Sequence, residues 1–252
     1  SVESGPAFKR DLGAKNATGE ILAFLDDDAY PKIDWLIKAS RHFEKDVRVA
    51  AVGGPAITPD SDSIRQKASG AVFTSKMGGG SISCRYWPGQ KVMEVNDFPS
   101  VNLLIRKDIF DKIGGFDSKY WPGEDTKLCH DIISNGYKII YDPEVHVWHH
   151  RRPSLIKHLK QVWNYAIHRG FFVKKYPANS RHLNYFIPSV FVVFIIAGLL
   201  FFPFGNFQEN KILLSIYFAV LLIYLFLLFI SGIIEANRIK SVAVGILVVP
   251  AI

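Results

Sequence analysis

The sequence contains little cysteine, and this excludes several protein classes. Its 252 residues include only Cys84 and Cys129. Two thiols cannot form the disulfide framework of a small secreted scaffold or a four-thiolate zinc site. We therefore expect both to pack as small apolar groups and the chemistry to come from other side chains. The hydrophobic content of 49% also excludes a disordered tail.

Charged residues are nearly absent from the C-terminal part, although the whole chain carries a formal charge of +7. Residues 182–208 and 212–234 contain no Asp, Glu, Lys or Arg. Each run is longer than the ~20 apolar residues that a bilayer-spanning helix needs. We expect transmembrane helices at about 183–204 and 212–234, and the start of a third at 241. Because the chain starts at Ser1 with no signal-like segment, we expect an internal fragment of a longer protein.

Acidic residues are missing from residues 151–181, which hold eight Lys and Arg residues directly before the first expected span. By the positive-inside rule, this places the preceding domain in the cytoplasm, and the chain is expected to be an integral membrane protein. Apolar residues recur at three- and four-residue spacing here, which predicts a basic amphipathic helix within residues 153–181 on an anionic leaflet. Nucleic acid is the competing partner for a basic aromatic stretch, but the adjoining spans favour a membrane and no nucleic acid.

Residues 1–152 alternate short apolar runs with helical patterns, which predicts a mixed α/β domain with a mainly parallel sheet. Strands are expected at residues 20–25, 49–52, 101–105, 137–141 and 145–148. Helices are expected at residues 6–18, 34–45, 108–113 and from about 124 to 135.

Three consecutive carboxylates, Asp26, Asp27 and Asp28, follow the first expected strand. In open α/β sheets, ligands bind at this edge. Strand alternation points Asp26 and Asp28 one way and Asp27 the other, so one pair could hold a hard divalent cation while another acid reaches a sugar hydroxyl. A solvated acidic turn is the alternative.

Two further clusters could take part in chemistry. Glu124 and Asp125 begin a helix, where the helix dipole favours ionised carboxylates, and an ionised Asp could act as a general base towards an alcohol. Ordinary helix capping is the alternative. The second cluster lies near the end of the domain, where imidazole can complete a Mn²⁺ site and arginine can bind phosphate. It comprises His146, His149, His150, Arg151 and Arg152.

In order along the chain, these motifs resemble a family 2 glycosyltransferase of the GT-A fold, a Rossmann-like α/β architecture. The matching segments cover nearly all of residues 6–152 and are Lys9–Asp28, Val101–Arg106, Ile113–Asp117, Gly123–Leu128 and the His-rich strand. The resemblance implies inverting sugar transfer from a nucleotide-diphospho-sugar to a lipid-linked or glycan acceptor. It also implies Mg²⁺ or Mn²⁺ as the cofactor.

The resemblance carries individual roles onto this sequence. Asp28 matches the principal metal ligand, and Asp26 and Asp27 contact the metal or the ribose and sugar of the donor. His149 lies where some members use a histidine near the metal and diphosphate.

The remaining roles concern the acceptor and the diphosphate. Asp125 matches the catalytic base, with Glu124 beside it in the acceptor pocket. Arg10 matches a donor-contacting basic residue, and Arg152 supplies a cation for the diphosphate.

The sequence departs from the family in two places. The N-terminal strands, which include the acid that recognises the nucleotide base, have no counterpart. Processive synthases carry Gln-x-x-Arg-Trp on the interfacial helix, whereas this chain has Gln161, then Asn164 and Tyr165 at the last two positions. The missing Arg favours transfer of a single sugar. A processive polysaccharide synthase is the alternative, and a non-catalytic membrane scaffold of the same fold is a third reading.

Overall fold

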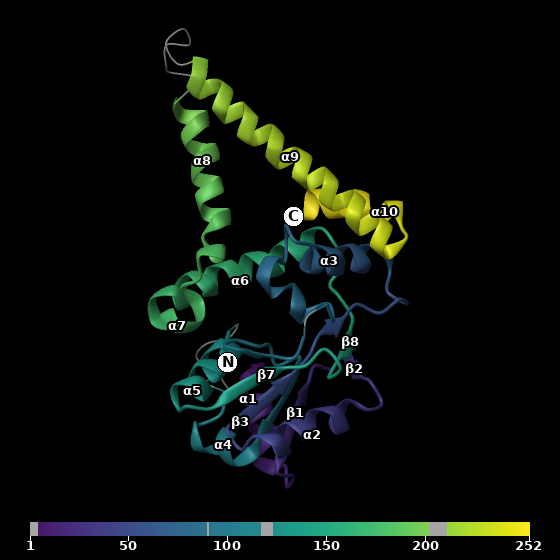
Figure 1. Cartoon of the computed structure of the whole chain (residues 1–252), viewed down its shortest axis with the longest axis vertical. Coiled ribbons are helices and arrows are strands. Elements are labelled where there is room, and N and C mark those ends of the chain that lie inside the picture. The colour runs from purple at the N-terminus through teal and green to yellow at the C-terminus, as the bar shows by residue number, and fades with distance from the viewer. Residues whose placement is uncertain (1–4, 90, 117–122, 202–210) are drawn as a thin grey trace.

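The computed structural model describes residues 5–89, 91–116, 123–201 and 211–252. Asp117 of the third family motif and residues 202–204 of the first expected span lie outside the described residues. Figure 1 shows an α/β body at one end, with helix α6 (Ile156–Lys175) running beside it. Helices α8 (Ile187–Phe201) and α9 (Lys211–Ile239) extend away from that body.

The described strands form two sheets. The five-stranded sheet has the order β1 (Ile21–Leu25), β6 (Asn102–Arg106), β3 (Val49–Gly53), β7 (Lys138–Tyr141) and β5 (Met93–Val95). The three-stranded sheet has the order β2 (Ala29–Pro31), β8 (Val147–His149) and β4 (Ala56–Ile57).

The mixed α/β class is confirmed, but strand pairing differs from the mainly parallel sheet that the sequence predicted. Among the described strands, only β3 with β7 and β4 with β8 pair in parallel, and the other four pairings are antiparallel. The main reason is that β6 lies between β1 and β3 and runs against both. The apolar pattern of a strand reports its burial, not the direction of its neighbours.

Helices cover both faces of the larger sheet. Along β6, Leu103 and Ile105 pack on one face with residues of α1 (Pro6–Asn16), α4 (Lys107–Lys112) and α5 (Glu124–Ser134). Leu104 points to the opposite face and packs with residues of α2 (Trp35–Lys45). This alternation gives a three-layered core that fixes the strand ends from which the site is built.

A buried asparagine ties the two sheets together. The Asn102 amide donates hydrogen bonds of 2.7 Å to the carbonyl oxygens of Gly54 and Val145, and its oxygen accepts one from Trp35 Nε1 at 2.8 Å. A Cβ atom at Gly54 would lie 2.0 Å from the Val145 oxygen, so only glycine fits there. These contacts hold the segment that leads into β8.

The C-terminal helices fold back onto the α/β body. Ala68, Ala71 and Val72 of α3 (Ile64–Thr74) pack with Val244 and Val248 of α10 (Val242–Val248). Of the helices in the described residues, α9 is long and apolar enough to cross a membrane, whereas α8 has 15 residues. The remaining short helices are η2 (Gly80–Arg85), α7 (Pro177–Ser180), η4 (Leu183–Tyr185) and η5 (Val249–Ala251).

Candidate active site

The pairing of two short strands brings the aspartate run next to the His-rich segment. In the β2–β8 pair, Ala29 lies opposite His149, and the His150 amide donates to the Asp28 carbonyl oxygen at 3.1 Å. The side chains of Asp28 and His149 consequently meet, with Oδ1 and Nε2 2.9 Å apart. Strand register therefore joins two sequence motifs that are 121 positions apart.

A metal ion could be held by Asp26, Asp28 and His149, which we call the metal-type group. One ligand atom from each lies within 4.8 Å of the others. Two carboxylates and an imidazole form a donor set that suits Mg²⁺ or Mn²⁺. These residues fit the expected site, whereas Asp27 is not part of this group.

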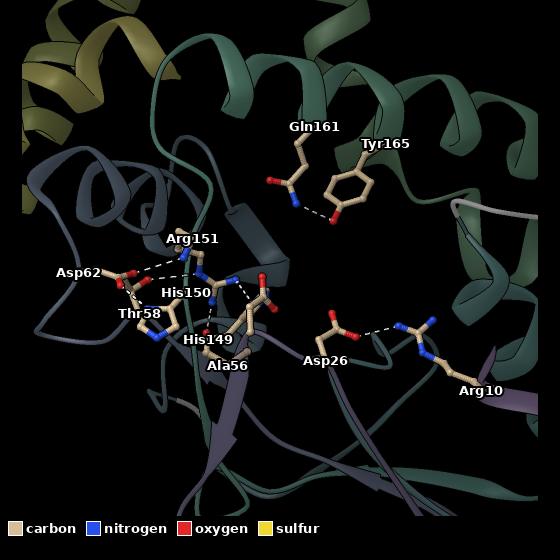
Figure 2. A network of polar contacts seen from close by, with 11 residues as sticks. Arg10, Asp26, Ala56, Thr58, Asp62, His149, His150, Arg151, Gln161 and Tyr165 are labelled. Atoms are coloured by element: carbon tan, nitrogen blue, oxygen red, sulfur yellow. Dashed lines mark hydrogen bonds and ion pairs between the residues drawn. The ribbon is translucent and has the colours of Figure 1, made fainter. Parts of the chain in front are cut away.

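Arg151 orients the imidazole of this group, as Figure 2 shows. Its Nη1 donates to His149 Nδ1 at 2.9 Å, and other guanidinium nitrogens donate to the Ala56 carbonyl and to Thr58 Oγ1. Burial, followed by the charge of Arg151, lowers the pKa of His149 and keeps the ring neutral. While Arg151 donates to Nδ1, the ring proton lies on Nε2, facing Asp28. For Nε2 to hold a cation, this proton would move to Nδ1 and Arg151 would release that nitrogen.

Arg10 joins the aspartate run to the start of α5. Its Nη2 lies 2.8 Å from Asp26 Oδ1, and its Nη1 lies 2.8 Å from Glu124 Oε1. Burial opposes the charge, but the neighbouring carboxylates raise the pKa of Arg10. Figure 2 shows its guanidinium reaching Asp26 from the side opposite Arg151. The metal-type group and the Glu124–Asp125 pair are thus parts of one site.

Asp125 has the environment of a general base. It lies in the first turn of α5, after Gly123, whose φ of 122° is a conformation that favours glycine. Its Oδ1 is buried and has no hydrogen-bond partner among the described residues. Burial, followed by the charge of Glu124, raises the pKa of Asp125 to about 7, against opposing effects of Arg10 and Ser100. A carboxyl with this pKa can exchange a proton near neutral pH.

Helix α6 places two polar side chains over the site. Gln161 Nε2 lies 3.0 Å from Tyr165 Oη, and Figure 2 shows both side chains directed from α6 towards Asp26. Tyr165 Oη accepts this hydrogen bond, so its phenol proton is left to donate.

The other members of the histidine and arginine cluster occupy different surroundings. His150 bonds to Asp62, and the His146 ring packs edge-on against Trp148. Arg152 lines a pocket beside Asp28. The sequence pattern indicated arginine as a phosphate ligand in this cluster. Arg151 contacts His149 Nδ1 and lines the same pocket as Arg152.

Several residues that support the site were not predicted from the sequence. The Tyr86 ring lies under the Arg151 guanidinium at 4.9 Å, and Asp62 holds both His150 and the Arg151 amide. Asp62 is 88 positions from His150 in the chain. No local pattern could have indicated such distant partners.

Comparison with known proteins identifies the family. Residues 21–231 match the family described as "Glycosyl transferase family group 2". The chain belongs to this family. The sequence-based assignment to family 2 is therefore confirmed.

Curated relatives of this glycosyltransferase differ in acceptor. The chain is 32% identical over 151 residues to the pre-mycofactocin glycosyltransferase of Mycobacterium tuberculosis, covering 60% of this chain and 31% of the relative. It is 23% identical over 211 residues to the glucosyl-dolichyl phosphate glucuronosyltransferase of Haloferax volcanii, covering 77% of this chain and 64% of the relative. The chain therefore spans about a third of the first relative and less than two thirds of the second.

A solved structure has the same fold. The mannosyltransferase PcManGT from Pyrobaculum calidifontis, solved with GDP-Man and Mn²⁺, matches 97% of this chain and 65% of its own chain. The TM-score is 0.52 and the sequence identity is 18%. This likeness confirms the expected GT-A architecture.

Proposed function

We propose that this glycosyltransferase moves a sugar from a nucleotide-diphospho-sugar, with inversion, to a lipid-linked acceptor at the cytoplasmic face of a membrane. The observation that carries the proposal is that the metal-type group and the Asp125 carboxyl, whose pKa is raised to about 7, belong to one site. Arg10 joins the two by contacting both Asp26 and Glu124, the neighbour of Asp125. In this reading, residues 1–152 are the catalytic domain, 153–181 the membrane-proximal helix and 182–252 the membrane region.

The chemical step follows from these groups. Ionised Asp125 accepts the proton of the acceptor hydroxyl as that oxygen bonds to the anomeric carbon of the donor. The bond from this carbon to the diphosphate breaks on the opposite face, and the electron pair leaves with the diphosphate. Asp26, Asp28 and His149 would hold Mg²⁺ or Mn²⁺, which would supply Lewis-acid stabilisation of that leaving group. Arg10 and Asp27 contact the donor, and Arg152 adds a positive charge near the diphosphate.

The membrane location is supported by apolar residues that the described part of the chain leaves uncovered. On α6, Ile156 is 83% exposed and Trp163 68%, although both are large apolar side chains. The lysines and arginines beside them suit an anionic cytoplasmic leaflet. The Haloferax volcanii relative is named for a glucosyl-dolichyl phosphate acceptor, which supports a lipid-linked acceptor here.

A donor panel tests the proposal. The protein in native-like membranes would be supplied with lipid acceptors, UDP-, GDP- or TDP-sugars, and Mn²⁺, Mg²⁺ or EDTA. We expect turnover of one donor that EDTA abolishes and Mn²⁺ or Mg²⁺ restores. Folded protein that turns over no donor would contradict the proposal and favour a binding role.

A processive polysaccharide synthase is the second candidate. The observation in its favour is that Gln161 and Tyr165 lie over the site, where the processive motif carries its Gln and aromatic residue. Asn164 in place of that motif's Arg argues for a single addition. Product length decides between them, because one added sugar contradicts processivity and a long polymer contradicts single transfer.

A further inference from the structure

A pocket of about 470 Å³ opens beside Asp28, between the start of α3 and the start of α6. Its volume falls in the range of small-molecule sites. Gln66, Arg152, Lys157 and Lys160 contribute to its wall, and Asp28 is its acidic member. The pocket therefore adjoins the metal-type group but has the opposite charge.

The two lysines of this pocket have no anionic partner in the part of the chain that the structure describes. Neither the Lys157 nor the Lys160 ammonium group makes an ion pair or hydrogen bond there, whereas Arg10 and Arg169 each contact a carboxylate. Two unpaired ammonium groups at one pocket favour an anion.

Gln66 adds a neutral donor on the other side. Its side-chain oxygen is already used at the start of α3, where it accepts from the Ser63 amide at 3.2 Å and lies 2.7 Å from Ser63 Oγ. This leaves the Nε2 group of Gln66 as the one it can offer to the pocket. Two ammonium groups and an amide N–H₂ form a donor set for phosphate oxygens.

The position of the lysines indicates which phosphate they would hold. They lie on α6 beside Ile156 and Leu159, which are 83% and 48% exposed. Cations among exposed apolar side chains lie at the level where lipid headgroups meet hydrocarbon. A phosphate joined to a polyprenyl chain has its charge at that level, whereas the diphosphate of the donor is drawn to the metal-type group.

We propose that Lys157 and Lys160, with the Gln66 amide, bind the phosphate group of a lipid-linked acceptor. This rests on the proposed function and adds a subsite to it. The pocket holds the lipid phosphate while the acceptor sugar reaches towards Asp125. Arg152 stays with the donor diphosphate.

Equilibrium binding tests the subsite without requiring turnover. The full chain in neutral-detergent micelles would be titrated with farnesyl phosphate and, separately, with farnesol. We expect the Lys157→Gln, Lys160→Gln double variant to bind farnesyl phosphate roughly ten-fold or more weakly, because charge-assisted hydrogen bonds are lost. Farnesol binding should be the same in both proteins.

A control removes one charge from the same helix and is compared with the single variants Lys157→Gln and Lys160→Gln. Lys174→Gln acts on an exposed lysine near the end of α6 that does not line the pocket. It should bind farnesyl phosphate as the unaltered protein does, and the Lys157→Arg, Lys160→Arg variant should retain most of the affinity. Equal weakening by Lys174→Gln would overturn the proposal in favour of diffuse charge.

Two competing ligands distinguish the remaining sources of phosphate. Phosphatidylglycerol at equal concentration should not displace farnesyl phosphate, and displacement would reassign the lysines to leaflet headgroups. UDP and GDP with Mn²⁺ should bind to the double variant as well as they bind to the unaltered protein. A loss confined to these nucleotides would reassign the pocket to the donor. If the donor panel fails but farnesyl phosphate still binds and its binding still depends on the lysines, only the proposed reaction is refuted.

Discussion

The α/β body and the long helix α9 place the same kind of side chain in opposite surroundings. Leu104 in β6 is 1% exposed, whereas Leu222 in α9 is 65% exposed. Phe110 in α4 is 3% exposed and Phe226 in α9 is 61% exposed. In the first region the apolar residues build the core that supports the site, and in the second they stay exposed. Under the proposed membrane location, the two regions need different solvents.

The largest effect is expected on sugar transfer, because we assign catalysis to the α/β body. Asp125→Asn should lower sugar transfer by about 10²–10⁴-fold, because the general base is lost, while nucleotide-sugar binding persists. Single-turnover transfer and donor binding would be measured together. Asp131→Asn, further along α5, is the control and should transfer normally. Full activity in Asp125→Asn would remove the base assignment.

A matched pair of leucines tests the two solvents directly. Leu104→Ala should lower the free energy of unfolding by about 2–5 kcal/mol, because it leaves a cavity in the core. Leu222→Ala should change it by about 0.5 kcal/mol or less in detergent, because the side chain packs on few protein atoms. Denaturant unfolding of both variants in the same micelles checks this. Similar losses in both would show that α9 is part of the protein core.

A smaller effect, on donor binding, is expected when a ligand of the metal-type group is removed. Asp28→Ala should weaken Mn²⁺-dependent nucleotide binding by at least about ten-fold, because a carboxylate ligand is removed. The measurement is nucleotide affinity across a Mn²⁺ titration. Asp27→Ala should leave the Mn²⁺ concentration for half-maximal binding unchanged, since Asp27 lies outside that group. An equal shift in both variants would contradict the ligand assignment.

The smallest expected effect is the dependence of the sugar-transfer rate on pH. Asp125, with a pKa of about 7, must be ionised to accept a proton, so transfer should rise from pH 6 to pH 8. Below the pKa the rate should fall about ten-fold per pH unit. Arg10→Gln removes a charge that lowers this pKa, so its profile should move to higher pH. A flat profile, or a shift to lower pH, would contradict this account.

Local sequence patterns predicted most of the elements and the chemistry of the site. The pattern at residues 20–25 anticipated β1 (Ile21–Leu25), and the acids at 124–125 begin α5 as expected. Uncharged runs predicted the apolar helices, and the motif order predicted the family. These features depend on neighbours within about four positions, which the sequence displays directly.

Contacts between distant segments were decided by the tertiary structure. Register between β2 and β8 brings Asp28 to His149, and helix packing brings Arg10 to Glu124, 114 positions away. The same packing directs Arg151 to His149 and places Lys157 and Lys160 beside a pocket. The sequence by itself determined which groups could act, because composition and spacing are local. Only the fold decided which of them meet, because sheet order and register join residues that share no local pattern.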